Sequence, residues 1–121
     1  MYDRPIIGQT SKGHQRSMFE RNNVNVLVAT CGRLMDHMKD GRVSLERVKF
    51  FVVDEADRML SENSMDDLED IIKSVSMPPR EKRQTLMYSA TFPEAIQRLA
   101  RNILNPTYLF CSVGVVGAGR F

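Results

Sequence analysis

The chain has 121 residues and a formal net charge of +2, with 42% hydrophobic and 26% charged residues. This composition matches soluble globular domains, so it excludes a wholly disordered chain and predicts one packed core at most. The charge is too weak to indicate a nucleic-acid partner by itself. The apolar runs are far too short to cross a bilayer, and the first ten residues do not resemble a signal peptide. The two cysteines, Cys31 and Cys111, have no metal-ligand spacing. We therefore expect a cytoplasmic or nuclear protein without a membrane partner.

Short apolar segments alternate with segments of helical periodicity. Buried strands are predicted at residues 5–7, 24–29, 48–53, 85–88 and 108–111, because each is short and bounded by turn residues. One helix is predicted from Ser64 through Val75, and a second from Pro93 up to the stop at Asn105 and Pro106. Strands that alternate with helices form parallel sheets. The predicted fold class is therefore α/β, a parallel sheet with helices on both faces.

Ligands of such sheets bind beyond the carboxyl ends of the strands, so the polar residues that follow each strand are the first candidates. The segment 8–13 has the glycine spacing of a phosphate-binding loop, but His14 and Gln15 follow Gly13 where Lys and Ser or Thr are needed. It is not a Walker A motif.

Thr30, Gly32 and Arg33 follow the strand predicted at 24–29 and open a helix. A hydroxyl, the backbone N–H groups of a helix start and a guanidinium together suit a phosphate, above all that of a nucleic-acid backbone. The alternative is an ordinary threonine N-cap beside a solvated arginine.

Three carboxylates, Asp54, Glu55 and Asp57, follow the strand predicted at 48–53. Such clustering is costly unless something uses it. Asp54 is placed to hold a nucleotide-bound Mg²⁺, which takes one carboxylate and keeps several waters. Glu55 is placed to deprotonate an attacking water. The alternative is that Asp54 or Asp57 caps a helix beginning at Ala56, and these residues alone do not decide between the two.

Ser89 and Thr91 follow the strand predicted at 85–88. Thr91 with Glu94 three residues later has the pattern of a capping box, with Pro93 in the first turn. Ser89 precedes that cap and can reach a neighbouring strand end. A cap and a functional role are compatible here.

The order Thr-x-Gly-Arg (30–33), Asp-Glu-Ala-Asp (54–57), Ser-Ala-Thr (89–91), each after a successive strand, resembles the DEAD-box RNA helicases. The similarity spans essentially the whole chain, and residues 54–60, 83–100 and 110–117 are most similar to the Vasa-like branch. The resemblance implies that residues 1–121 are the C-terminal half of the first RecA-like domain. The P-loop part and the second RecA-like domain are then expected outside this sequence.

The resemblance also implies the roles of the acids and hydroxyls. Asp54 and Glu55 would serve Mg²⁺-ATP binding and hydrolysis, with ATP and Mg²⁺ as cofactors. Asp57, Ser89 and Thr91 would couple the nucleotide state to local RNA unwinding. Without the arginine fingers of a second domain, the isolated chain is expected to be inactive.

The implied RNA contacts are Thr30, Gly32 and Arg33 on the sugar-phosphate backbone, with Gly8 in the glycine-doublet region of the family. Contacts to the backbone carry little sequence specificity. Gln9 replaces the second glycine of the doublet, and Cys31 stands where the family usually has proline. The segment 61–65 also departs from the Asp-x-Gly-Phe pattern that usually follows the acids.

Two other readings stay open from the sequence. One is a short non-catalytic RNA-binding adaptor or competitor derived from the same domain. The other is a motor that acts on DNA, which the combination of Thr-x-Gly-Arg with Ser-Ala-Thr disfavours. The Vasa-like character suggests perinuclear germline granules as the location in the cytoplasm.

Overall fold

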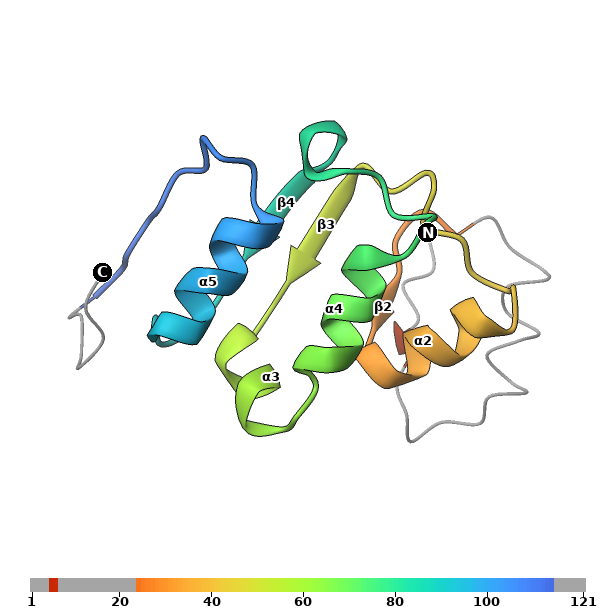
Figure 1. The fold of residues 1–121 in the computed structure, drawn as a ribbon, viewed down its shortest axis with the longest axis horizontal. Helices are drawn as coiled ribbons and strands as arrows, with labels where there is room; N and C mark the ends of the chain where they lie inside the picture. Colours follow the sequence, from red (N-terminus) through yellow and green to blue (C-terminus); the bar gives the residue numbers. More distant parts are fainter. Residues whose placement is uncertain (1–4, 7–23, 115–121) are drawn as a thin grey trace.

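The computed structural model describes residues 5–6 and 24–114, and Gly8 and the segment 8–13 lie outside them. Strands and helices alternate along this part of the chain (Figure 1). The strands are β1 (Pro5–Ile6), β2 (Val28–Ala29), β3 (Phe50–Val53) and β4 (Gln84–Met87). The helices are α2 (Cys31–Lys39), α3 (Ala56–Ser61), α4 (Met65–Lys73) and α5 (Glu94–Ile103), with a short 3₁₀ turn η1 (Arg80–Lys82) before β4.

The strands pair in parallel, as the alternation of elements predicts. β1 pairs with β2, and β3 pairs with β4 in a register that sets Phe50 opposite Gln84 and Val53 opposite Met87. Parallel strands need a crossover connection, and α3 and α4 supply it between β3 and β4. The α/β class is confirmed.

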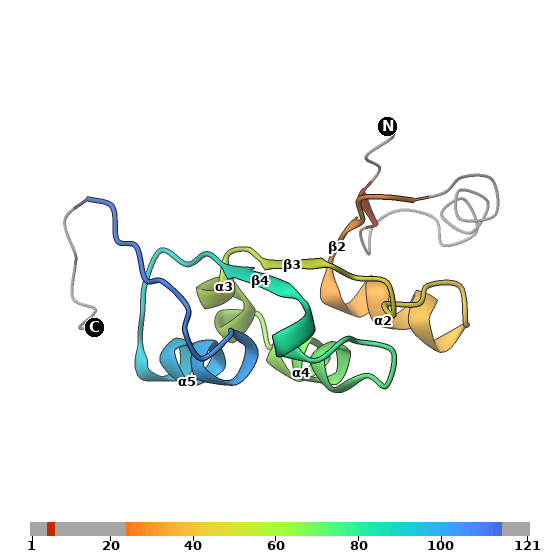
Figure 2. The same ribbon diagram turned by 90° about the horizontal axis from the view of Figure 1, so that it is seen from above.

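The described helices cover one face of the β3–β4 pair. Figure 2 shows α3, α4 and α5 on the same side of the two strands. The main core lies in this layer and consists of Val53, Ala56, Leu68, Ile96, Leu99, Ala100, Ile103 and Leu104. On the other face Phe50 and Val52 are 71% and 54% exposed. The described residues therefore supply one of the two helical layers that the sequence predicts.

Two sequence-based boundaries are wrong. Residues 108–111 form no strand, because within the described part of the chain no strand edge pairs with them, and Leu109 is 97% exposed. The helix that begins at Met65 ends at Lys73, so Val75 does not join its apolar stripe and is fully exposed. Apolar residues alone do not make a strand, since the ladder needs a partner.

The loop after α3 keeps its backbone conformation despite its unusual sequence. Asn63 has φ 55°, a left-handed value, and the N–H of Ser64 donates to the Met59 carbonyl at 3.0 Å. This is the helix ending that glycine usually makes, and asparagine is the next most common residue there. Asn63 thus takes the place of the glycine in the Asp-x-Gly-Phe pattern.

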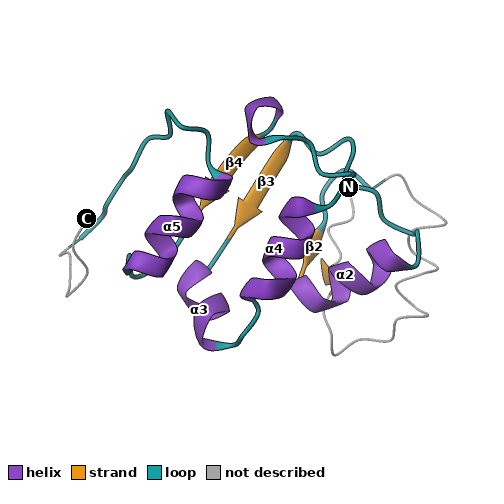
Figure 3. Ribbon diagram, in the orientation of Figure 1, coloured by secondary structure: helices purple, strands orange, loops and turns teal. Residues whose placement is uncertain are grey.

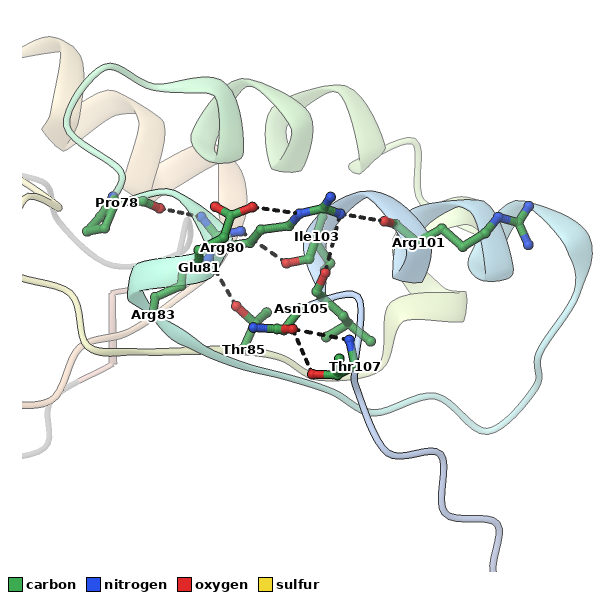
Figure 4. Close-up of polar contacts among 10 residues, drawn as sticks. Pro78, Arg80, Glu81, Arg83, Thr85, Arg101, Ile103, Asn105 and Thr107 are labelled. Carbon is green, nitrogen blue, oxygen red and sulfur yellow. Dashed lines mark hydrogen bonds and ion pairs between the residues drawn. The ribbon is translucent and has the colours of Figure 1, made fainter.

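Arg83 joins three parts of the fold at the amino end of β4 (Figure 4). Its guanidinium donates to the carbonyls of Pro78 and Ile103, at 2.6 and 3.2 Å, and to the Thr85 hydroxyl at 2.9 Å. It also lies over the Phe51 ring, 5.5 Å from the centroid, in cation–π contact. Burial lowers the pKa of Arg83, and the nearby Glu81 partly opposes that shift. Arg83 therefore ties the end of α5 to the sheet.

Replacing Arg83 with methionine is expected to lower the free energy of unfolding by about 2–4 kcal/mol. The variant leaves the Pro78 and Ile103 carbonyls without their donor in a buried setting. Urea unfolding of the chain measures the change. Lys82→Met, next to it and exposed, is the matched control and should stay within about 0.5 kcal/mol of the parent. Equal effects of the two substitutions would contradict the role given to Arg83.

Candidate functional site

Two polar loops meet where β3 and β4 end. Figure 3 draws the arrowheads of β3 and β4 at the same edge, with the loops beyond them. The Tyr88 N–H donates to the Val53 carbonyl at 2.8 Å, and the Ala56 N–H donates to the Tyr88 carbonyl at 3.0 Å. These bonds extend the pairing past the strands. They hold the acids after β3 beside the Ser-Ala-Thr segment after β4.

The first two acids lie at an exposed corner between β3 and α3. Asp54 accepts a hydrogen bond from the Glu55 N–H through Oδ1, at 2.9 Å. Glu55 has φ 52° and ψ 48°, a left-handed conformation that costs a non-glycine residue about 1–2 kcal/mol. Glu55 is itself the N-cap residue of α3 and makes no side-chain capping bond. The alternative in which Asp54 or Asp57 is the cap is therefore wrong.

The side chain of Glu55 is held by Arg58. Arg58 Nη1 contacts Glu55 Oε2 at 2.9 Å, and Nη2 contacts Glu62 Oε1 at 3.1 Å. The hydrogen bond to Glu55 is the main cause of the raised pKa of Arg58. Our sequence analysis overlooked Arg58, although its spacing of three and four residues from two glutamates is the usual signal for ion pairs on a helix.

Asp57 and Thr91 join the two loops through their side chains. The Thr91 hydroxyl donates to Asp57 Oδ2 at 3.4 Å, although 34 residues separate them. The capping box expected of Thr91 does not form, because α5 begins one residue after Pro93, its N-cap, without a side-chain cap. Instead the Gln97 amide donates to the Phe92 carbonyl at 3.0 Å. The hydroxyl of Thr91 thus points to the acids rather than to its own helix.

Ser89 lies in the same loop. Its Oγ is buried and has no hydrogen-bond partner within the described residues. A buried hydroxyl without a partner is uncommon, because it forgoes hydrogen bonds to water. The site therefore contains one donor that a rearrangement of these loops can satisfy.

The Thr-x-Gly-Arg segment opens α2, as expected. Thr30 is the N-cap residue of α2 but makes no side-chain capping bond, which contradicts the simple capping alternative. Gly32 is exposed, and a Cβ built on it would meet only Asp67 Oδ2, at 3.6 Å. The fold thus leaves room for a side chain at position 32. Arg33 is half-buried in the first turn.

Burial raises the pKa of the Cys31 thiol, and Asp67 raises it further. Because a protonated thiol is a poor nucleophile, Cys31 fills the usual proline position as a small apolar residue. The described contacts of this segment are with α4, as the closeness of Gly32 and Asp67 indicates. The structure thus joins the second and third motifs by hydrogen bonds and sets the first at the start of α2.

The donors at the end of β3 fit a hydrated Mg²⁺. Asp54 is exposed, and its hydrogen bond to Glu55 engages only Oδ1. One carboxylate is sufficient for an ion that keeps most of its waters and takes its other ligands from phosphate. In the described ranges, three or more potential ligands do not gather at one point as an all-protein metal site would require.

Comparison with known proteins adds to this geometry. The DEAD/DEAH box helicase family pattern matches residues 3–99, which include all three motifs. The chain belongs to this family. It is 47% identical over 116 residues to the "Probable ATP-dependent RNA helicase DDX4" of Pelophylax lessonae, over 94% of this chain. It is 46% identical over 112 residues to the ATP-dependent RNA helicase DDX4 of Mus musculus, over 93% of this chain.

A more distant family member is the ATP-dependent RNA helicase glh-2 of Caenorhabditis elegans, 38% identical over 118 residues and 97% of this chain. The chain spans only 16% of the length of the frog and mouse helicases and 12% of the nematode one. Among the described residues of this family member, none of the helices has the length and apolarity of a membrane span.

Substituting valine for Thr91 tests which partner its hydroxyl serves. We expect the free energy of unfolding to change by less than about 0.5 kcal/mol, because the bond to Asp57 is long and exposed. Loss of a true N-cap would cost about 1 kcal/mol. Thermal or urea unfolding distinguishes the two, with Thr91→Ser as the control that keeps the hydroxyl. A loss of the full capping value in the valine variant alone would restore the capping box.

Proposed function

We propose that the chain is the C-terminal half of the first RecA-like domain of an ATP-dependent RNA helicase. The whole enzyme binds RNA and couples ATP hydrolysis to local unwinding of a duplex. The observation that carries this proposal is the contact between Asp57 and Thr91, which links the acids after β3 to the Ser-Ala-Thr segment after β4. A simple RNA-binding adaptor gains nothing from that link.

In this proposal Asp54 and Glu55 serve the nucleotide. Asp54 holds Mg²⁺ through water, and an ion bound there neutralises charge on the transferred phosphoryl group. Glu55 accepts a proton from the water that attacks the γ-phosphate. Support comes from its place in the exposed corner, where Arg58 keeps its carboxylate oriented at 2.9 Å. Its neighbours Val53 and Ala56 are buried, so the corner itself is fixed.

The coupling role falls to Asp57, Ser89 and Thr91. The bond between Thr91 and Asp57 is long, at 3.4 Å, and Ser89 Oγ is buried without a partner in the described residues. Both features suit an arrangement that tightens when nucleotide binds. In that event a change at the phosphates reaches the loop before α5 through hydrogen bonds alone.

The RNA contact is assigned to Thr30, Gly32 and Arg33 at the start of α2. The backbone N–H groups of a helix start and a guanidinium both favour phosphate oxygens. Gly32 supports this role because the fold has room for a Cβ there, which makes close approach of a ligand a reason for glycine. Gly8 remains a predicted contact outside the described residues. Location in perinuclear germline granules likewise stays a prediction.

Glu55→Gln in the full-length protein is expected to keep ATP and RNA binding and to lower RNA-stimulated ATP hydrolysis at least about 100-fold. The amide keeps the shape of the side chain but cannot take the proton. Single-turnover hydrolysis and equilibrium binding of a fluorescent nucleotide separate the two effects.

Glu62→Gln is the matched control, because Glu62 accepts from the same Arg58 on the next turn of the helix. It should leave hydrolysis close to the parent rate. Undiminished RNA-stimulated hydrolysis in the Glu55 variant would refute its role as general base.

Arg33→Ala in the full-length protein is expected to weaken RNA binding to a similar degree for unrelated sequences. It should also reduce the dependence of log affinity on log salt by about one, as the loss of one phosphate contact predicts. Fluorescence anisotropy with several oligonucleotides measures both. Lys39→Ala, at the exposed far end of the same helix, is the control. Weakening confined to particular base sequences would argue for base readout instead.

A further inference from the structure

The Ser-Ala-Thr loop touches a distant segment of the chain as well as the acids. The rings of Phe92 and Phe110 lie 5.0 Å apart between centroids, at an interplanar angle of 48°. This separation lies within the range in which aromatic pairs attract each other beyond simple burial. Phe92 directly follows Thr91, and Phe110 belongs to the extended segment after α5.

Phe110 is less exposed than the residues around it in that segment. Leu109 and Val113 are 97% and 94% exposed, whereas Phe110 is 48% exposed. The segment 107–114 contains no regular secondary structure that would hold it to the fold. Its contact with Phe92 is therefore a specific attachment rather than general packing.

The backbone of Phe92 is fixed independently of that contact. The Gln97 amide donates to the Phe92 carbonyl at 3.0 Å, which anchors the residue to the first turns of α5. Two consecutive side chains then point to different partners, Thr91 to Asp57 and Phe92 to Phe110. A movement of the loop toward the acids must therefore also move the ring of Phe92 relative to Phe110.

We propose that Phe110 is a positioning residue that transmits the movement of the Ser-Ala-Thr loop to the segment after α5. The inference rests on the proposed function and deepens it, because it adds a second arm to the coupling assigned to Asp57, Ser89 and Thr91. Phe110 touches neither nucleotide nor RNA. It acts through Phe92, and the aromatic contact carries the movement that the hydrogen bond at Thr91 begins.

The test uses the full-length protein with Phe110→Ala, Phe92→Ala and the double substitution. The measured quantities are the kcat and KM for ATP in RNA-stimulated hydrolysis, and the number of duplexes separated per ATP hydrolysed. Loss of an aromatic contact is expected to lower that yield about threefold to tenfold, with the KM for ATP unchanged. The double variant should be no worse than either single variant, because both remove one contact.

Leu109→Ala is the matched control, since it lies next to Phe110 and is almost fully exposed. It should leave the yield unchanged. Phe110→Tyr keeps the ring and should restore the parent yield. Phe110→Leu keeps an apolar side chain without the ring and serves where the alanine variant unfolds, with a reduced yield expected.

A purely structural role would lower thermal stability, hydrolysis and unwinding together, and the effects of the two single substitutions would add. That pattern, or an unchanged yield in the Phe110 variants, overturns the inference. The proposed function is read from a different measurement, the RNA-stimulated hydrolysis of the unmutated protein. Its absence there overturns both proposals, whereas an active parent with insensitive Phe110 variants overturns only this one.

Discussion

The site depends on the continuation of one parallel strand pair beyond its regular end. Val53 lies opposite Met87 in the register, and the next hydrogen bonds run from Tyr88 to Val53 and from Ala56 to Tyr88. Because both strands point the same way, each delivers its polar residues to the same edge. The Asp57–Thr91 contact follows from this register. A shift of one residue would turn the side chains that follow the strands to the other face and separate the two motifs.

The opposite end of the pair is fixed by charge rather than by apolar packing. Arg83 donates to carbonyls from the loop before β4 and from the end of α5, and Arg80 adds a bond of 2.9 Å to the Arg101 carbonyl. These donors satisfy carbonyl groups at the end of α5, where the last turn of any helix leaves carbonyls without partners. With α5 anchored there, the loop before it has a fixed starting point. The geometry of Ser89 and Thr91 thus depends on an arginine at the far end of the strand.

The sequence was sufficient to predict the order of elements and the residues of the site, because apolar strands followed by polar residues are local patterns. It was insufficient wherever an outcome depended on a distant partner. Residues 108–111 have the composition of a strand, yet composition does not say whether an edge is present to pair with. Thr91 and Glu94 have the spacing of a capping box, yet Asp57, 34 residues away, takes the hydroxyl. Arg83 gave no signal because its acceptors are backbone carbonyls, which every residue has.

The conformation of Glu55 shows how buried neighbours determine an exposed functional residue. Its left-handed backbone costs about 1–2 kcal/mol, and the exposed ion pair with Arg58 returns only about 0.3–0.5 kcal/mol. The ion pair cannot therefore be what imposes the conformation. Val53 and Ala56, on either side of the corner, are 2% and 0% exposed, and the Ala56 N–H is bonded across to β4. With those flanking residues fixed in the core, the chain has to turn sharply between them, and the turn directs the carboxylate of Glu55 outward. Arg58 then selects among the orientations that the turn allows, so the backbone and the side chain of the proposed base are set by separate interactions.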